Sequence, residues 1–281
     1  MSVKVSVCVP AYNNADTITE TLDCVLNQSY QNLELIVVDD NSSDQTYSLL
    51  KQYESNKKDE RLKVFHNDYN LGMAGNWNYC LSLCEGEYLR LLCGDDLIDI
   101  DLIRREVEVL DENPDVLMVS SDTRFIGLDG KLGGQYKRFY KSGAIEGIEA
   151  VRFSFFTRDY LGAPLANLFR RSAYKKVGGF DSEFSYIIDY DFFVAIALLG
   201  KIYIIHEPLN YFRLRPTSNT SEVLGGAGAD EYIKEHEKLI NKYSADLKIN
   251  EWQIKLSVFI RKNMIRLGDW YLRVFMKEKR R

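Results

Sequence analysis

The 281-residue sequence lacks the marks of several large classes of protein. No run of about 18 apolar residues occurs, so no membrane-spanning helix is predicted. The opening, MSVKVSVCVP, is too short and too alternating for a signal peptide. Only 5 prolines occur, and the 46% hydrophobic and 27% charged residues are typical of a globular chain rather than a disordered one.

Common nucleotide-binding and nucleophile motifs are also missing. Neither GxGxxG nor GxxxxGK followed by Ser or Thr occurs, which argues against a Rossmann dinucleotide site and a P-loop. GxSxG is absent, so Ser-His-Asp catalysis lacks its motif. The three histidines are too scattered to predict a zinc site. A nucleotide bound here would have to be held by side chains and a metal ion.

Cysteine usage indicates a reducing environment. The five cysteines lie in apolar strand or helix patterns and form no CxxC pair. They are Cys8, Cys24, Cys80, Cys84 and Cys93. We interpret them as reduced core thiols of a cytosolic protein, rather than as disulfides or metal ligands.

The net charge of -5 hides an uneven distribution. Residues 252–281 contain nine Lys or Arg and two acids, which gives this segment a net charge of +7. The preceding 251 residues therefore have a net charge of -5 - 7 = -12. A chain with so acidic a body has no general basic surface, and we therefore expect no nucleic-acid partner.

Strand and helix patterns alternate through the first half of the chain. Apolar runs predict strands at 3–10, 33–38, 61–66, 87–92 and 116–121, with helices at 15–28, 43–55, 73–84 and 100–112. Asp16 is the expected N-cap of the first helix. Continuous apolar runs suit strands buried on both faces. The pattern predicts an α/β fold with a mostly parallel central sheet flanked by helices.

The second half is less regular, and its elements are predicted as follows. Residues 122–145 are expected to form an antiparallel segment with turns at 128–130 and 133–134, followed by a helix at 146–157. A strand, a short helix and a glycine turn are expected within 165–181, and a further helix at 191–199. Strands at 201–206 and 210–215 and helices at 230–243 and 250–275 complete the prediction. Gly225, Gly226 and Gly228 predict a loop or hinge before the last two helices. We expect a catalytic domain over 1–221, with halves 1–121 and 122–221, and a helical extension over 222–281.

Polar and acidic residues follow each of the first four strands. They are Pro10, Tyr12 and Asn13, then Asp39, Asp40 and Asn41, then His66, Asn67 and Asn70, then Gly94, Asp95 and Asp96. Each could cap a helix, but capping does not explain two adjacent carboxylates at the ends of two apolar strands, because the second adds repulsion. In open parallel sheets ligands bind at this rim. A divalent cation, Mg²⁺ or Mn²⁺, shared with phosphate would relieve the repulsion.

Four segments together resemble the inverting, nucleotide-sugar-dependent glycosyltransferases of family 2, which have the GT-A fold. They are VCVPAYNNADTITETLDCVLNQSYQNLELIVVDDNSSD, NLGMAGNWN, GEYLRLLCGDD and GGFDSEFSYIIDYDFFVAIALLG. The resemblance covers about residues 2–221. It implies an enzyme that moves a sugar from a nucleoside diphosphate sugar, with UDP the expected nucleotide, to a glycan or lipid-linked acceptor. It also implies a role in bacterial cell-envelope polysaccharide synthesis.

The resemblance assigns roles to particular residues. Pro10, Ala11, Tyr12, Asn13, Asp39, Asp40, Asn70 and Asp95 match nucleotide-binding positions, Asp96 and Asp95 match the metal-binding motif, and Asp189 matches the general base. Of the adjacent pair, Asp96 is the expected principal metal ligand. Arg213 and Arg215 are candidate diphosphate contacts, since guanidinium groups match phosphate oxygens; a surface salt bridge is the alternative.

Three departures from the family pattern leave other functions open. Cys93-Gly94 stands where relatives have an acid, Ile188 where they often have Glu, and Arg215 where they often have His. A non-catalytic partner subunit would keep the fold without the chemistry. A sugar nucleotidyltransferase would also use aspartates and Mg²⁺, but PAYNNADT lacks the glycine-rich basic loop that such enzymes usually carry.

The last predicted helix has an apolar face beside a basic stripe. The basic residues are Lys255, Lys262, Arg266, Arg273 and Lys277. The apolar residues are Trp252, Leu256, Phe259, Ile260, Met264, Leu267, Trp270, Tyr271 and Val274. The helix is expected either to pack on the catalytic domain, or to lie on the inner face of a bacterial plasma membrane through residues 250–277. A cytoplasmic, peripheral enzyme would suit the second alternative.

Overall fold

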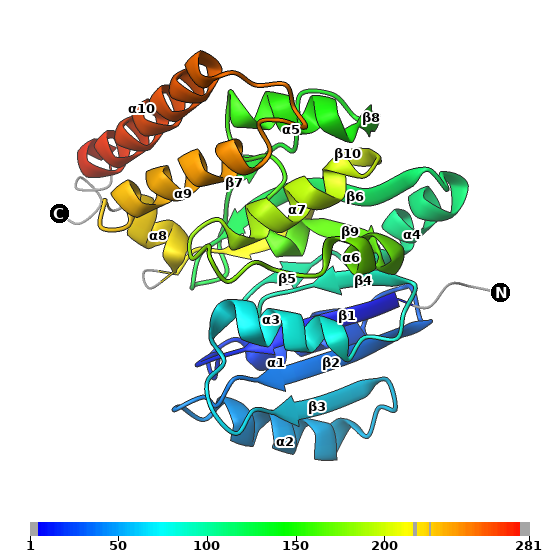
Figure 1. The fold of residues 1–281 in the computed structure, drawn as a ribbon. Coiled ribbons are helices and arrows are strands. Elements are labelled where there is room, and N and C mark those ends of the chain that lie inside the picture. The colour runs from blue at the N-terminus through cyan, green and yellow to red at the C-terminus, as the bar shows by residue number, and fades with distance from the viewer. Residues whose placement is uncertain (1–4, 216–217, 225, 276–281) are drawn as a thin grey trace.

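The computed structural model describes residues 5–215, 218–224 and 226–275. In these residues one ten-stranded sheet runs through the molecule in the order β3-β2-β1-β4-β9-β6-β10-β5, with β7 beside β6 and β8 beside β10 (Figure 1). The strands are β1 Val5–Ala11, β2 Leu33–Asp39, β3 Leu62–His66, β4 Tyr88–Leu91, β5 Leu97–Ile98, β6 Val116–Ile126, β7 Leu132–Tyr136, β8 Gly143–Glu146, β9 Asn167–Arg170 and β10 Lys201–Arg213.

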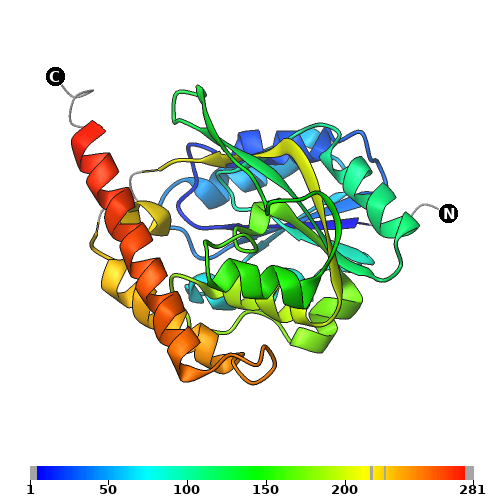
Figure 2. The ribbon, with the colours of Figure 1, turned by 90° about the horizontal axis from the view of Figure 1, so that it is seen from above.

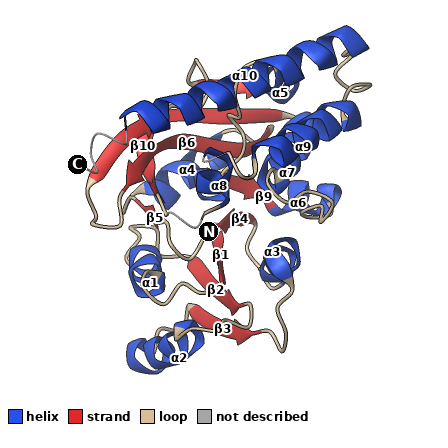
Figure 3. Ribbon diagram, turned by 90° about the vertical axis from the view of Figure 1, so that its left-hand side faces the viewer, coloured by secondary structure: helices blue, strands red, loops and turns tan. Residues whose placement is uncertain are grey.

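Helices cover both faces of this sheet, as Figure 3 shows for α1 and α2 on one side and α3 on the other. The helices are α1 Ile18–Leu26, α2 Thr46–Lys57, α3 Gly72–Ser82, α4 Leu102–Glu112, α5 Gly147–Phe155, a 3-10 turn at Pro164–Ala166, α6 Arg171–Val177, α7 Ile188–Leu198, α8 Asn219–Leu224, α9 Ala229–Lys242 and α10 Glu251–Phe275. Side chains of β1 alternate between two cores: Val7 and Val9 pack with α1, α2 and α4, while Cys8 packs with α3 and α7. Burial on both faces explains the continuous apolar runs.

The predicted α/β fold is confirmed, because the longest ladders of the sheet are parallel. β1 pairs with β2 and β4, β2 with β3, and β6 with β10, all in parallel. β9 is inserted antiparallel between β4 and β6. The carboxyl ends of β1, β2, β3 and β4 therefore meet at one edge, where the sequence places its polar residues.

Two predicted local features are wrong. Asp16 is exposed and precedes the N-cap position of α1, which Thr17 occupies, so Asp16 is not the cap. Gly133 and Gly134 lie within β7 rather than in a turn, because the chain already reverses at 127–131, where the Gly127 N–H donates to the Lys131 carbonyl at 2.9 Å.

The boundaries of later elements also differ from the prediction. β10 is one strand rather than two, and its pairing with β6 shifts register around Pro208, whose ring removes a backbone donor. α7 begins at Ile188 rather than at residue 191, which places Asp189 in its first turn. α8 is an additional short helix that the sequence analysis does not predict.

The C-terminal helices and the state of the cysteines agree with the prediction. α9 and α10 follow a connection that contains Gly226 and Gly228, whereas Gly225 lies outside the described residues. All five cysteines are free thiols. No helix in the described part of the chain combines the length and apolar character needed to cross a bilayer.

Candidate functional site

A cavity of about 300 Å³ opens at the carboxyl ends of β1, β2 and β4. Its lining comprises Pro10, Ala11, Tyr12, Asn14, Asp40, Asn70, Gly72, Met73, Asn76, Trp77, Cys93, Gly94 and Asp95. Six of the predicted site residues are in this lining: Pro10, Ala11, Tyr12, Asp40, Asn70 and Asp95. Asn13, Asp39, Asp96, Asp189, Arg213 and Arg215 do not line it, and their places are described below.

A larger open groove of about 590 Å³ lies between α4 and β10. Two arginines that line this groove already form ion pairs with glutamates, Arg105 with Glu207, and Arg104 with Glu108 at 2.8 Å. It also lies away from the polar residues that follow the parallel strands. We therefore take the smaller cavity as the candidate site.

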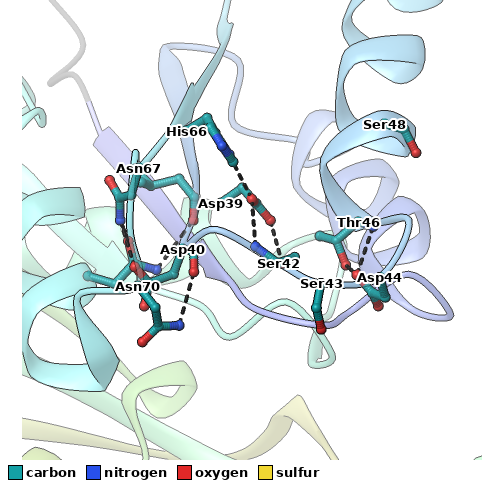
Figure 4. Close-up of polar contacts among 12 residues, drawn as sticks. Asp39, Asp40, Ser42, Ser43, Asp44, Thr46, Ser48, His66, Asn67 and Asn70 are labelled. Carbon is teal, nitrogen blue, oxygen red and sulfur yellow. Dashed lines mark hydrogen bonds and ion pairs between the residues drawn. The ribbon is translucent and has the colours of Figure 1, made fainter.

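Asp39 ends β2 and Asp40 follows it, and the two have different surroundings (Figure 4). The Asp39 carboxylate is fully buried, accepts the Ser42 backbone N–H at 3.1 Å, and lies 2.9 Å from Nδ1 of His66. Asp40 Oδ1 accepts the Asn67 amide and the Leu71 N–H, both at 2.8 Å. Among the described residues no donor reaches Asp40 Oδ2. Asp39 thus fixes the loop, while Asp40 keeps an acceptor for a ligand in the cavity.

Two consecutive asparagines tie the loop after β1 to the loop after β2. Asn13 adopts a left-handed conformation with φ 51°, which asparagine tolerates better than most residues, and its Oδ1 accepts the Ser43 N–H at 3.0 Å. Asn14 Oδ1 accepts the Tyr12 N–H at 2.9 Å, and the Asn14 N–H donates to Thr46 Oγ1, at the start of α2, at 2.8 Å. These bonds hold Tyr12, which is 50% exposed, with its backbone fixed at the mouth of the cavity.

The segment after β4 brings three possible metal ligands together. The Cys93 thiol and the Asp95 and Asp96 carboxylates offer ligand atoms within 4.8 Å of one another. Gly94 sits between them against the β1 loop, where an added Cβ would lie 2.9 Å from Oδ1 of Asn14. A side chain at this position would collide with Asn14 and Ile18, so glycine allows the close approach.

The two aspartates of this segment differ in exposure and in partners. Asp95 lines the cavity, and its Oδ2 lies 3.2 Å from Nη1 of Arg215. Asp96 is only 2% exposed, and its Oδ1 accepts the Arg213 N–H at 2.9 Å. Burial, and next the charge of Asp95, raise the pKa of Asp96 well above its usual range. The nearby charges of Arg213 and Arg215 therefore do not offset the cost of ionising Asp96, which fits a site for a cation.

Cys93 is a site residue whose position the sequence analysis assigns to the core. It is half-buried, it lines the cavity, and burial raises the pKa of its thiol well above the ordinary value. The sequence signal is its position in Cys93-Gly94, directly before the two aspartates, where many relatives of the resembled family have an acid. The structure places its sulfur within 4.8 Å of a carboxylate oxygen of Asp95 and of Asp96.

Arg213 and Arg215 have different environments although they are two residues apart. Arg213 is 5% exposed, and its guanidinium donates to Glu20 at 2.7 Å and to the Asp95 carbonyl at 2.8 Å. It therefore supports the acidic segment from behind. Arg215 is half-buried and pairs with Asp95 on the side of the β1 loop, where its Nη2 reaches the Asn13 carbonyl at 3.4 Å.

Asp189 lies in the first turn of α7, apart from the acidic segment but close enough for its charge to raise the pKa of Cys93. Its Oδ2 accepts the Ala163 N–H at 2.7 Å and its Oδ1 the Tyr190 N–H at 2.8 Å. Burial, and next the negative charge of Asp159, raise the pKa of Asp189 to about 6. A carboxylate with this pKa is a better proton acceptor than an ordinary aspartate and is still ionised at neutral pH.

Asp159 is a neighbour of Asp189 that the sequence analysis misses. Its Oδ1 accepts the N–H groups of Leu161 and Gly162, at 3.0 and 2.7 Å, and so shapes the loop that ends at Ala163. Nothing in the sequence pattern marks Asp159, because it is 30 residues from Asp189 and follows no strand. At the end of this loop, the Ala163 N–H contacts Asp189 directly.

Asp191 faces away from Asp189, as the helical spacing predicts. Its carboxylate accepts the Tyr243 hydroxyl at 3.0 Å and pairs with Lys242 at 2.9 Å. Both partners lie at the end of α9, so Asp191 joins α7 to the C-terminal helices.

Comparison with known proteins decides the family. The sequence profile described as glycosyl transferase family 2 matches residues 6–178, which is more than half of the chain. The chain belongs to glycosyl transferase family 2. It is an enzyme of that class, and the resemblance predicted from its motifs is confirmed. The matched range includes Asp40, Asp95 and Asp96 but ends before Asp189.

Two relatives of this glycosyltransferase illustrate how far the similarity extends. The chain is 31% identical over 223 residues to an uncharacterized glycosyltransferase of Haemophilus influenzae, and the match covers 77% of this chain and 67% of that protein. It is 38% identical over 92 residues to the UDP-Glc:alpha-D-GlcNAc-diphosphoundecaprenol beta-1,3-glucosyltransferase WfaP of Escherichia coli, covering 33% of this chain and 35% of that protein.

Solved structures of other glycosyltransferases have the same fold. TarS of S. aureus in complex with UDP-GlcNAc matches with a TM-score of 0.65 and 20% identity, over 95% of this chain and 88% of that chain. The mannosyltransferase PcManGT of Pyrobaculum calidifontis, in complex with GDP-Man and Mn²⁺, matches with a TM-score of 0.66 and 18% identity, over 96% of this chain and 74% of that chain. The predicted GT-A fold is confirmed.

Proposed function

We propose that this glycosyltransferase transfers a sugar from a UDP-sugar to a hydroxyl of a glycan or lipid-linked acceptor, with inversion at the anomeric carbon. The observation that carries the proposal is the cavity itself, which joins Tyr12 and Asp40 at one side to Cys93 and Asp95 at the other. The WfaP relative, by its name, uses UDP-Glc and a lipid-linked acceptor. A role in bacterial envelope polysaccharide synthesis accords with that relative.

In this proposal the nucleotide occupies the side of the cavity formed by the first two strands. The exposed ring of Tyr12 offers a flat surface for the base. Asp40 Oδ2 is available to accept the N–H of a uracil ring, and Asn70 holds the Asp40 carbonyl at 3.0 Å. Pro10 and Ala11 form the floor, whereas Asn13 and Asp39 act indirectly by fixing the loops.

The residues after β4 fit a divalent cation, with Asp96 and Asp95 as carboxylate ligands and Cys93 beside them. Burial and the charge of Asp95 disfavour the ionised form of Asp96 and raise its pKa, and a bound Mg²⁺ or Mn²⁺ would stabilise that form. The cation, when bound, supplies positive charge to the diphosphate leaving group. Arg215, beside Asp95, is placed to contact the same diphosphate, whereas Arg213 is not, because its guanidinium is held behind the segment.

In the transfer step Asp189 accepts the proton of the acceptor hydroxyl. The acceptor oxygen forms a bond to the anomeric carbon while the bond from that carbon to the diphosphate oxygen breaks, and the nucleoside diphosphate leaves with the electron pair. The Ala163 and Tyr190 N–H groups orient the carboxylate. One base without a second nucleophile gives inversion. We assign the donor to residues 1–121, the base and acceptor to 122–221, and a supporting extension to 222–281.

A ligand screen tests the proposed donor. Thermal unfolding is measured with UDP-, dTDP- and GDP-sugars, each with and without Mn²⁺. We expect the largest rise in melting temperature with a UDP-sugar and Mn²⁺ together, because ligand binding to the native state stabilises it. Slow release of UDP in the same samples would identify an active enzyme. Stabilisation by a GDP- or dTDP-sugar instead would contradict the choice of nucleotide.

The raised pKa of Asp189 predicts a pH dependence of transfer. Only the ionised carboxylate accepts a proton, so activity should be low well below pH 6, rise through about pH 6, and level off above it. Because Asp159 contributes to the raised pKa of Asp189, Asp159→Asn should move the inflection to lower pH while its amide oxygen still accepts the loop N–H groups. The measurement is the pH profile of transfer at saturating donor and Mn²⁺. An unchanged inflection in the variant would exclude the influence of Asp159.

A further inference from the structure

One face of α10 packs on the catalytic domain. Ile254, Ser257, Arg261 and Ile265 are buried and repeat at helical spacing. Ser257 donates to the Phe155 carbonyl at 2.6 Å, and Arg261 donates to the Ser154 carbonyl at 3.1 Å, both at the end of α5. For this face of α10, the predicted alternative of a helix packed on the catalytic domain is therefore correct. The same contacts turn the opposite face of α10 away from the domain.

The opposite face of α10 exposes large apolar side chains in a line. Trp252 is 69% exposed, and Phe259 and Leu267 are each 64% exposed. Their spacings of seven and eight residues, close to two turns each, place them on one side of the helix. Figure 1 shows α10 at the outer edge of the molecule beside α9, and Figure 2, seen from above, shows no other element over it. Single exposed apolar residues are ordinary, whereas an aligned set on one helix indicates a partner.

Basic residues border this apolar line. Lys255, Lys262 and Arg266 are all exposed and occupy neighbouring positions around the helix, three or four residues from Trp252, Phe259 or each other. Between 251 and 267 the sole acid is Glu251, in the first turn. The face therefore combines apolar side chains with positive charge at its edge. The basic and apolar residues predicted beyond residue 267 lie outside the described side chains.

We propose that this outer face of α10 docks on the surface of an anionic lipid bilayer. Trp252, Phe259 and Leu267 enter the boundary between headgroups and acyl chains, while the lysines and the arginine meet lipid phosphates. An acidic protein partner would match the charges but would not need three large apolar side chains in line. A second copy of this chain would bring the same positive charges together across the interface.

The inner face of the same helix links the bilayer to the acceptor side of the enzyme. The charge of Arg261 acts on Asp159, which is the neighbour of Asp189. A bilayer on the outer face would lie about one helix diameter, roughly 10 Å, from these residues. This geometry suits a lipid-linked acceptor, and that part of the inference rests on the proposed function. Docking itself does not, because it depends only on the exposed face.

Vesicle sedimentation with the full chain tests the inference. We expect binding to vesicles of phosphatidylcholine and phosphatidylglycerol in equal parts, at least tenfold weaker binding to phosphatidylcholine alone, and release by high salt. Trp252→Ser with Phe259→Ser and Leu267→Ser should lower binding at least tenfold, as should Lys255→Gln with Lys262→Gln and Arg266→Gln. Leu128→Ser with Lys131→Gln, on an exposed turn of the chain, is the matched control and should bind as the unaltered chain does.

Donor binding separates this inference from the proposed function. All substituted side chains are exposed, so the variants should fold and keep the thermal shift with the UDP-sugar and Mn²⁺. Absence of vesicle binding by the unaltered chain, or equal binding by all variants, would overturn the docking surface. A dimer that the apolar substitutions dissociate would assign the face to a second copy and would also overturn it. Absence of a thermal shift with the UDP-sugar and Mn²⁺ in the unaltered chain would instead count against the proposed donor.

Discussion

Asp189→Asn is expected to lower sugar transfer by about 10²–10⁴-fold, the usual contribution of a general base, while donor affinity stays within a few-fold. The amide has nearly the same shape, and its oxygen still accepts one of the N–H groups that hold the carboxylate, from Ala163 or Tyr190. It does not accept a proton from the acceptor hydroxyl. Transfer is measured with saturating donor, and donor affinity is measured by calorimetry with UDP and Mn²⁺.

Asp191→Asn is the matched control, because it lies on the same helix but bonds Lys242 and Tyr243 instead of facing Asp189. We expect it to lower the melting temperature, since the buried side chain at position 191 loses its ion pair with the more exposed Lys242, and to leave transfer within a few-fold. If Asp189→Asn transfers sugar at the rate of the unaltered enzyme, Asp189 is not the base.

The second large effect is expected from removal of Asp96, the proposed principal metal ligand. Asp96→Ala should weaken binding of a UDP-sugar in the presence of Mn²⁺ and lower transfer, each on the order of 10²-fold, because charge stabilisation of the diphosphate is lost. Asp96 also accepts the Arg213 N–H, and leaving that donor buried without a partner costs about 1–3 kcal/mol. Asp96→Asn keeps the acceptor and removes the charge, so it separates metal binding from folding.

Two further variants make the metal measurement specific. Asp68→Ala removes an exposed acid on the same rim, after β3, and should change neither Mn²⁺ dependence nor donor affinity. Cys93→Ser replaces the soft sulfur by a hydroxyl and should lower affinity for Mn²⁺ less than Asp96→Asn does, because the two carboxylates remain. Transfer that is independent of added or chelated metal in the unaltered enzyme would refute the cation site and leave the fold assignment intact.

The fold could be predicted because its signals are local in the sequence. Apolar runs of four to eight residues mark strands wherever both faces of a sheet are covered, and here they recur between helices. The errors occur where tertiary contacts override local preference. β10 continues through Pro208 because pairing with β6 resumes beyond it, and Gly133 and Gly134 extend because β6 lies alongside.

The site could be predicted only in part, for a related reason. Residues at the ends of parallel strands are brought together by the topology alone, so Tyr12, Asp40 and Asp95 meet at one cavity as expected. Residues that reach the site from irregular segments are not marked in this way. Asp159 is the example, since its position beside Asp189 depends on the folding of the loop that ends at Ala163.

By itself the sequence determined the α/β architecture, the edge of the sheet at which the candidate site lies, and the family to which its motifs belong. The tertiary structure alone decided that Arg213 supports the acidic segment while Arg215 lies beside it, that Cys93 joins the two aspartates, and which face of α10 remains exposed. The physical reason is that periodicity and strand ends are properties of neighbouring residues. Burial and charge compensation, in contrast, are set by contacts such as that of Arg213 with Asp95, 118 positions away along the chain.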